Sequence, residues 1–418
     1  MKNKKGYDRN YWAMLFEGTS FIGSVAIMAS GGAVAVFINT MTDSIALVGL
    51  GVTAQSLFLL LGQLIVAPYM SAIKNLPGTM FKIMLFRLIP FAMAIPLFLG
   101  FDGYLAVGIF LVLYSLFWLS DGVNTIPWGE LAARTIKPDL RGHMMGMQIA
   151  TGGIVSLLTG LLLAWLLATP LLSDYNRFAA IFVLTGIVIL PSLIFIRLVK
   201  DPSPIEKVIK PNARRYYANL IPIIKSSKPL QFAIIARIPG FIGFATLTFL
   251  VVFGQNTLNI TDAQLSWLVY SQIVGALLGG VLLGEVSRRF GNKVVIILSN
   301  VGTLITLSLA IALAFSPSLG YIWLLATCIF ASIWSSQWLG YFNYFLDIAP
   351  RKDRPAFQMI GNCIGIPFSF VGYLIGAIID QAGFVVAFVL GSATAIITIM
   401  FSLRLLSPKK IEALELEQ

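Results

Sequence analysis

A carboxylate, an amide and an aromatic side chain share one face of an apolar run, residues 104–128. Trp118, Asp121 and Asn124 recur at helical spacing, so their side chains project from the same side of a helix. At about 1.5 Å per residue, Asp121 lies roughly 13 Å from the end of that helix near Glu130. A carboxylate at that depth has no easy route to water except a cavity, where it can exchange a proton or bind a solute.

A second run carries a similar set of side chains. Gln337, Trp338 and Tyr341 lie at helical spacing within residues 321–346. Flat aromatic faces stack on sugars and on amphipathic organic molecules alike, so the chemistry indicates a binding cavity without naming its ligand.

The elements that must position these residues are long apolar helices. The chain of 418 residues is 58% hydrophobic and 11% charged, whereas soluble domains carry about a quarter charged residues. A helix needs roughly 20 apolar residues to cross a bilayer. Twelve such runs are predicted, near residues 11–38, 45–69, 83–99, 104–128, 145–168, 178–199, 230–252, 264–286, 294–315, 321–346, 357–379 and 384–406.

Lys and Arg fall almost entirely on one side of this topology. If the runs alternate in direction, all of the 29 basic residues except Arg177 lie on the side that both termini share. Because positively charged loops resist export, we expect a multi-pass protein of the cell membrane with both termini in the cytoplasm. The net charge of +11 then follows from topology and from attraction to anionic lipid, and it requires no nucleic-acid partner.

A polar segment divides the runs into two sets of six. We predict an N-terminal six-helix bundle over residues 1–200, a cytoplasmic linker over residues 201–229 and a C-terminal six-helix bundle over residues 230–418. A loop motif recurs in both sets, because a carboxylate is followed by a proline and an arginine after the fourth run and again after the tenth. The motif residues are Glu130, Pro138 and Arg141, then Asp347, Pro350 and Arg354.

These two loops resemble the major facilitator superfamily, whose six-helix halves carry a similar acidic, proline and arginine pattern there. The loop from Gly284 to Lys293 is similar to a further signature of that family, although Arg288 stands where the family has aspartate. Glu285, one turn earlier, is a candidate replacement for that charge. The resemblance implies an all-α integral membrane fold of 12 transmembrane helices in two pseudo-symmetric bundles, which rock about a central site.

The resemblance also implies roles for individual residues. Helices one, four, seven and ten line the family's cavity, which would here hold Glu17, Trp118, Asp121, Asn124, Arg237, Gln337, Trp338 and Tyr341. The cytoplasmic gate would hold Glu130, Arg141, Glu285, Arg288, Arg289, Asp347 and Arg354. Glu17 and Arg237 are each only about 10 Å from a helix end, so snorkelling or a structural salt bridge is an open alternative for both.

Glycines on two predicted helices suit close packing. Gly275, Gly279, Gly280 and Gly284 give small faces on the eighth run, and Gly361, Gly365, Gly372 and Gly376 do so on the eleventh. In the family these helices join the two halves, so separable packing is one interpretation and ordinary membrane packing is the other.

The expected function is secondary active transport of a small organic solute, coupled to a proton or another ion. A multidrug-type exporter of amphipathic compounds is the alternative, although the fifth run lacks the Gly-Pro pattern typical of such antiporters. A non-transporting membrane sensor and a membrane enzyme are further, less favoured alternatives. An enzyme, a cofactor or a metal site is not expected, because His143 is the only histidine and Cys328 and Cys363 lie in predicted spans. We expect a monomer.

Overall fold

The chain is helical throughout the part that the computed structural model describes, and it carries enough apolar helices for a multi-pass membrane protein. That part is residues 8–407 apart from 31, 137, 170–171, 202–211, 259, 317, 319, 336 and 351–353. Ten of the described helices are long and apolar enough to cross a membrane, and Ala33–Thr42 and Gly320–Trp334 are shorter apolar helices. The predicted all-α integral membrane fold is therefore confirmed.

Contacts divide the chain into two compact units, residues 1–29 with 54–213 and residues 30–53 with 214–418. Residues 30–53 thus pack with the second half of the sequence although they belong to the first. The predicted division at a linker over residues 201–229 stays a prediction.

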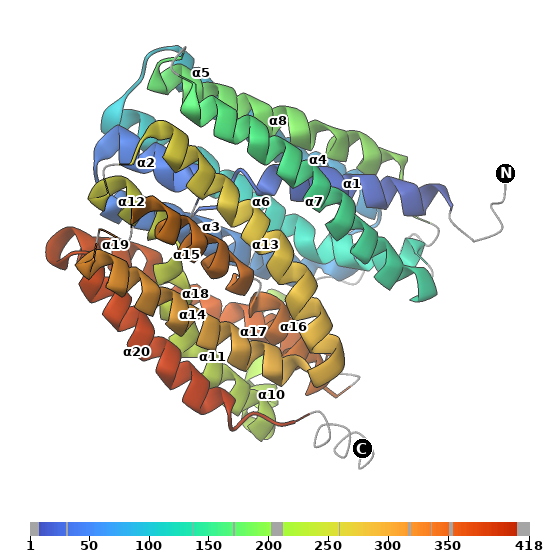
Figure 1. Cartoon of the computed structure of the whole chain (residues 1–418). Coiled ribbons are helices and arrows are strands. Elements are labelled where there is room, and N and C mark those ends of the chain that lie inside the picture. Colours follow the sequence, from blue (N-terminus) through green and yellow to red (C-terminus); the bar gives the residue numbers. More distant parts are fainter. Residues whose placement is uncertain are drawn as a thin grey trace. The chain divides into compact units, whose positions relative to one another are not determined.

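The first unit contains one group of packed helices. α1 packs against α7 and α8, and α5 packs against α6 and α8 (Figure 1). Its elements are α1 (Arg9–Val25), residues 54–66 of α3 (Ile45–Val66), η1 (Ala67–Ala72), α4 (Leu76–Met84), η2 (Leu85–Leu88), α5 (Ile89–Phe98), α6 (Gly103–Thr135), α7 (Pro138–Ala168) and α8 (Asp174–Leu198).

The second unit contains the other group. α11 and α14 pack against α20, and α13 packs against α15 (Figure 1). Its elements are α2 (Ala33–Thr42), residues 45–53 of α3, α9 (Ala213–Ala218), α10 (Leu220–Ser226), α11 (Lys228–Leu247), α12 (Leu250–Thr257), α13 (Asp262–Phe290), α14 (Asn292–Phe315), α15 (Gly320–Trp334), α16 (Gln337–Asp347), α17 (Arg354–Cys363), α18 (Gly365–Phe368), α19 (Val371–Ala382) and α20 (Phe384–Ser402).

Several of the predicted spans are broken helices. The first run is divided into α1 and α2, the seventh into α11 and α12, the tenth into α15 and α16, and the eleventh into α17, α18 and α19. A break releases backbone groups that a continuous helix would pair, which membrane proteins tolerate where the backbone is buried in protein or lines a cavity. The break in the tenth run also interrupts the helical period, so Trp334 packs beside Gly302 of α14 while Tyr344 contacts the chain after α20.

Some of the predicted glycine faces meet other helices directly. A Cβ at Gly275 or Gly279 would collide with the backbone carbonyls of Ile329 and Ile333 in α15. A Cβ at Gly280 or Gly284, in contrast, would have no atom within 4 Å. The half of this stripe that carries Gly275 and Gly279 therefore serves helix packing inside the second unit.

Candidate functional site

Two carboxylates of the first unit share one buried arginine. Nη1 of Arg87 lies 2.7 Å from Oε1 of Glu17, and Nη2 lies 3.4 Å from Oδ1 of Asp121. All three residues are buried, with residue exposures of 1% for Glu17, 4% for Arg87 and 8% for Asp121. We call this group of Glu17, Arg87 and Asp121 the ion triad.

The two carboxylates of the ion triad have different hydrogen-bond partners. The indole Nε1 of Trp128 donates to Oε2 of Glu17 at 2.8 Å, so Glu17 receives donors on both oxygens. Arg87 also lies over the ring of Phe21, 4.5 Å from its centroid. The side chain of Asp121 has only the longer contact with Arg87 among its described hydrogen bonds, and it is therefore the less firmly held carboxylate.

Arg87 reaches this position because the third span starts earlier than its predicted start at residue 83. The apolar stretch that could cross a membrane runs over Leu76–Phe98, so Arg87 stands near its middle. The prediction that Arg87 belongs to the cytoplasmic basic residues does not fit this position or its exposure of 4%. The short 3₁₀ segment η2 joins α4 to α5 here, and 3₁₀ turns inside a helical span often mark a functional site or strain.

The other predicted residues of the fourth span lie next to the ion triad in sequence and are buried. Trp118 is buried and packs edge-on against the rings of Tyr114 and Phe117. Asn124 donates from Nδ2 to the carbonyl of Ser120 at 3.0 Å. Within the described residues its Oδ1 has no hydrogen-bond partner although it is buried, so this oxygen can accept a hydrogen bond from a ligand or a water molecule.

In the second unit, Arg237 of α11 stands among aromatic rings. Its Nη1 donates to the carbonyl of Gly361 at 2.8 Å. The guanidinium carbon lies 5.2 Å from the ring centroid of Phe241, 5.3 Å from that of Tyr341 and 5.8 Å from that of Phe345. No carboxylate of the described residues pairs with Arg237, which is half-buried.

The structure describes two of the three predicted residues of the tenth span. Tyr341 is buried and donates its hydroxyl to the carbonyl of Ala236 at 3.2 Å. Gln337 is buried too, and its Oε1 has no partner among the described residues. The side chain of Trp338 lies outside the described residues. Tyr341 and Arg237 therefore come together, which the sequence analysis expected from the family resemblance alone.

The predicted gate residues form separate ion pairs in each unit. In the first, Arg134 pairs with Glu130 at 2.8 Å and with Asp201 at 3.4 Å. In the second, Glu285 pairs with Arg289 one turn along α13. Asp347 accepts a hydrogen bond from Nδ2 of Asn292 at 2.6 Å. The side chains of Arg141, Arg288 and Arg354 lie outside the described residues. The gate role of all seven predicted residues stays a prediction.

The sequence did not predict two sets of contacts within the second unit, one between α19 and α3 and one between α2 and α12. The carboxylate of Asp380 in α19 accepts the backbone N–H groups of Ile45 at 3.2 Å and Ala46 at 2.8 Å, so it caps the first turn of α3. Asn39 of α2 donates to Asn256 of α12 at 2.9 Å. A carboxylate at a helix N-terminus is favoured by unpaired N–H groups and by the helix dipole.

The described part of the chain holds no group of three or more His, Cys, Asp or Glu residues that could bind a metal ion. The residues brought together are instead suited to ionic and hydrogen-bonding contacts with an organic solute or a proton.

The sequence and the fold were compared with those of known proteins. The model of the Major Facilitator Superfamily matches residues 234–417, and no curated protein sequence matches significantly. Among solved structures, a D-xylose-proton symporter is similar with a TM-score of 0.70 and 14% identity, over 96% of this chain and 98% of that one. The inward open xylose transporter of E. coli is similar with a TM-score of 0.70 and 13% identity, over 97% of this chain and 98% of that one. A nucleoside transporter is similar with a TM-score of 0.68 and 12% identity, over 96% of this chain and 100% of that one.

Proposed function

We propose that the chain is a member of the major facilitator superfamily, whose model matches residues 234–417, and that it moves a small organic solute by alternating access with a proton as the coupling ion. Members of this family are transporters and not enzymes, so the predicted enzyme alternative is set aside. The single observation that carries the proton-coupling proposal is the ion triad, in which two buried carboxylates share one arginine.

The charge of the ion triad supports a proton site. With both carboxylates ionised its net charge is −1, and one bound proton makes it neutral. Burial of an uncompensated charge costs free energy, so the neutral form suits a closed cavity and the charged form suits a hydrated one. A solvent-access change would thus be accompanied by proton uptake or release, which is the requirement for coupling.

Asp121 is the carboxylate we assign to the proton. Glu17 is held by Arg87 and Trp128 together, whereas Asp121 has the 3.4 Å contact with Arg87. One of the similar solved structures is a D-xylose-proton symporter, and coupling to a proton in this chain would be of the same kind. Glu17 then serves to position Arg87, which is the structural salt-bridge role left open by the sequence.

Replacing Asp121 by asparagine should uncouple transport from the proton gradient. The amide keeps the shape and can still accept a hydrogen bond from Arg87, but it cannot exchange a proton near neutral pH. Liposomes loaded with a pH-sensitive dye and exposed in turn to sugars, amino acids, organic acids and amphipathic cations should report solute-driven proton flux for the wild type. We expect D121N to lose about ten-fold or more of that flux while retaining ligand-induced thermal stabilisation.

Asp102→Asn is the matched control, because Asp102 is exposed at the start of the same helix α6. It should leave both measurements unchanged. Transport by D121N with an unaltered pH dependence would remove Asp121 from the coupling mechanism.

Arg237 supports a narrower substrate class, a solute with a carboxylate or phosphate group. A cation in a membrane span is costly unless it is paired, and Arg237 has aromatic rings and one carbonyl but no described carboxylate beside it. An anionic group of the solute would supply the missing charge, and the rings of Phe241 and Tyr341 would flank its carbon skeleton.

Arg237→Gln should weaken binding of anionic solutes selectively. Thermal stability measured with glucose, gluconate and glucose 6-phosphate compares one skeleton with different charges, and we expect the wild type to be stabilised by an acid more than by the neutral sugar. R237Q should lose about ten-fold in apparent affinity for that acid, since one ion pair is worth about 1.4 kcal/mol or more. Arg214→Gln, on exposed α9, is the control. Equal stabilisation by all three compounds would contradict the anionic class.

A further inference from the structure

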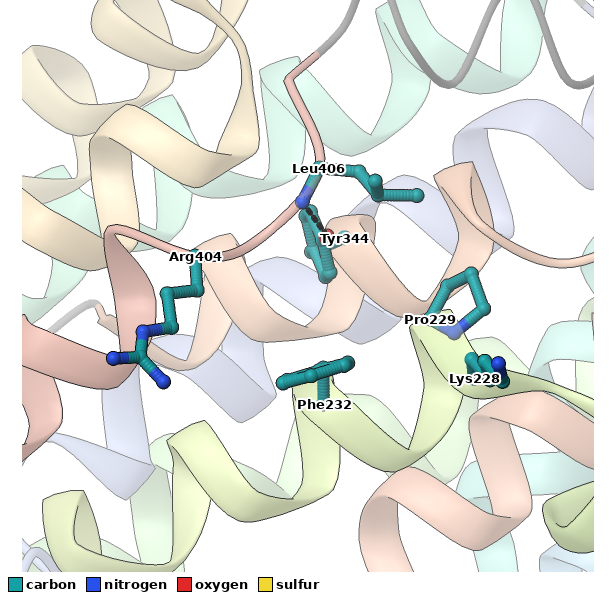
Figure 2. Close-up of a pocket in the computed structure, with 6 residues that line it drawn as sticks. All are labelled: Lys228, Pro229, Phe232, Tyr344, Arg404 and Leu406. Atoms are coloured by element: carbon teal, nitrogen blue, oxygen red, sulfur yellow. Dashed lines mark hydrogen bonds between the residues drawn. The ribbon is translucent and has the colours of Figure 1, made fainter.

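A pocket of about 190 Å³ lies at one end of the second unit, and its lining does not include Arg237, Phe241 or Tyr341. Figure 2 shows Phe232 in the centre, with Arg404 and Lys228 on opposite sides of it. The lining residues are Lys228, Pro229, Phe232, Tyr344, Arg404 and Leu406. The pocket thus combines two cationic side chains with a largely apolar floor.

Three chain segments build this pocket and hydrogen bonds fix them. Leu406 donates its backbone N–H to the hydroxyl oxygen of Tyr344 at 2.9 Å (Figure 2). Nζ of Lys293 donates to the carbonyl of Leu403 at 2.8 Å and to that of Leu405 at 2.7 Å. The turn that carries Arg404 is therefore anchored at both of its neighbours, so the pocket is a built feature of the fold.

The pocket lies at the boundary of the apolar helices. Lys228 is the first residue of the span Lys228–Thr257, and Arg404 is the second residue after the span Phe384–Ser402. α11 and α20 pack against each other, so both charges stand at the same end of two adjacent spans. Phe232, one turn inside, is 48% exposed. Cationic side chains at the ends of apolar spans, with an aromatic ring one turn inside, are typical of a bilayer interface, where headgroups meet acyl chains.

We propose that this pocket binds an anionic phospholipid. Its headgroup phosphate would interact with Lys228 and Arg404, neither of which has a carboxylate partner within the described residues. The start of an acyl chain would cover the exposed ring of Phe232. Basic pockets between transmembrane helices bind acidic headgroups in this way, and each nearby cation adds to the attraction. The occupant is a membrane lipid because the apolar floor adjoins the span and the charges stand at its rim.

The test is thermal stability of the full-length protein in detergent, titrated with phosphatidylglycerol and separately with phosphatidylcholine. We expect phosphatidylglycerol to stabilise the wild type more, and K228Q/R404Q to lose about ten-fold or more of its apparent affinity. K228R/R404K keeps the charges and should keep most of the response. R214Q/K225Q removes two exposed charges from α9 and α10 and should behave as the wild type.

Each other outcome overturns the proposal. Equal responses to the two lipids, or an unchanged response in K228Q/R404Q, would show that these cations do not select an anionic lipid. Loss of the response in K228R/R404K as well would indicate a packing defect instead of lost charge. Equal stabilisation by inorganic phosphate without lipid would indicate a site for small anions.

Discussion

Arg87→Gln should abolish solute-driven flux and lower the thermal stability of the protein more than any other single substitution considered. It leaves Glu17 and Asp121 facing each other in a buried site without their shared cation. Breaking a buried ion pair by removing one partner costs about 3–5 kcal/mol, and here two carboxylates lose the same partner. The measurements are the melting temperature in detergent and the initial flux in liposomes.

A double variant separates charge from shape. R87Q/E17Q removes one carboxylate together with the arginine, so it should regain a large part of the stability that R87Q loses, through a coupling of roughly 0.5–3 kcal/mol between contacting residues. Flux should not return, because Asp121 still lacks Arg87. E17Q alone completes the cycle: a loss of stability in R87Q/E17Q equal to the sum of the losses in R87Q and E17Q would mean that the two side chains are not coupled.

Arg177→Gln is the matched control within the same unit. Arg177 is also largely buried, but its carboxylate partner Asp174 is 53% exposed at a distance of 3.2 Å. Solvent screens such a pair, so its loss should cost about 1 kcal/mol or less. A loss as large as that of R87Q would show that the assay reports any buried arginine and not the ion triad.

The contrast between Asp121 and Arg87 shows what sequence reasoning can reach here. Asp121 stands alone in a long apolar run, so its depth could be calculated from the helix rise. A carboxylate at that depth predicted a proton or solute site. Arg87 lies within a few residues of Lys82, and it was therefore counted with the preceding basic loop. The signal that could have found it was the apolar stretch before it, since the span begins at Leu76.

The broken spans limit what helical spacing can predict. In the fourth span, one unbroken helix keeps Trp118, Asp121 and Asn124 on a common period. In the tenth, the break after Trp334 changes the phase, so Trp334 and Tyr344 contact different neighbours. Periodicity was thus informative where backbone hydrogen bonding is continuous. The pairing of Arg237 with Tyr341 crosses two helices, and only the family resemblance could bring them together.

Close packing of α3 on α19 leads to the second large effect. A Cβ at Gly372 would lie 2.7 Å from Cβ of Val52 and 2.9 Å from the carbonyl oxygen of Gly49. Tyr373 donates its N–H to the hydroxyl of Thr53 at 3.2 Å, and Asp380 caps the start of α3 two turns further on. These contacts form one seam that closes only if the two backbones approach each other closely.

Gly372→Leu should therefore force this seam apart. Overpacking costs about 1–3 kcal/mol. Under the proposed alternating access we expect this seam to open and close in each cycle, so flux should fall about ten-fold or more. A cysteine introduced at Ser44, beside the capped turn, should react several-fold faster with a membrane-impermeant maleimide in G372L than in the otherwise wild-type protein.

Gly280→Leu is the control, because a side chain at Gly280 meets no atom within 4 Å. It introduces the same side chain into another glycine-containing span and should change neither flux nor labelling. If G372L labels and transports like G280L, the seam does not close during transport. If G372L loses flux while labelling at Ser44→Cys stays unchanged, the defect lies elsewhere in the cycle, and the assignment of this seam as a closing contact fails.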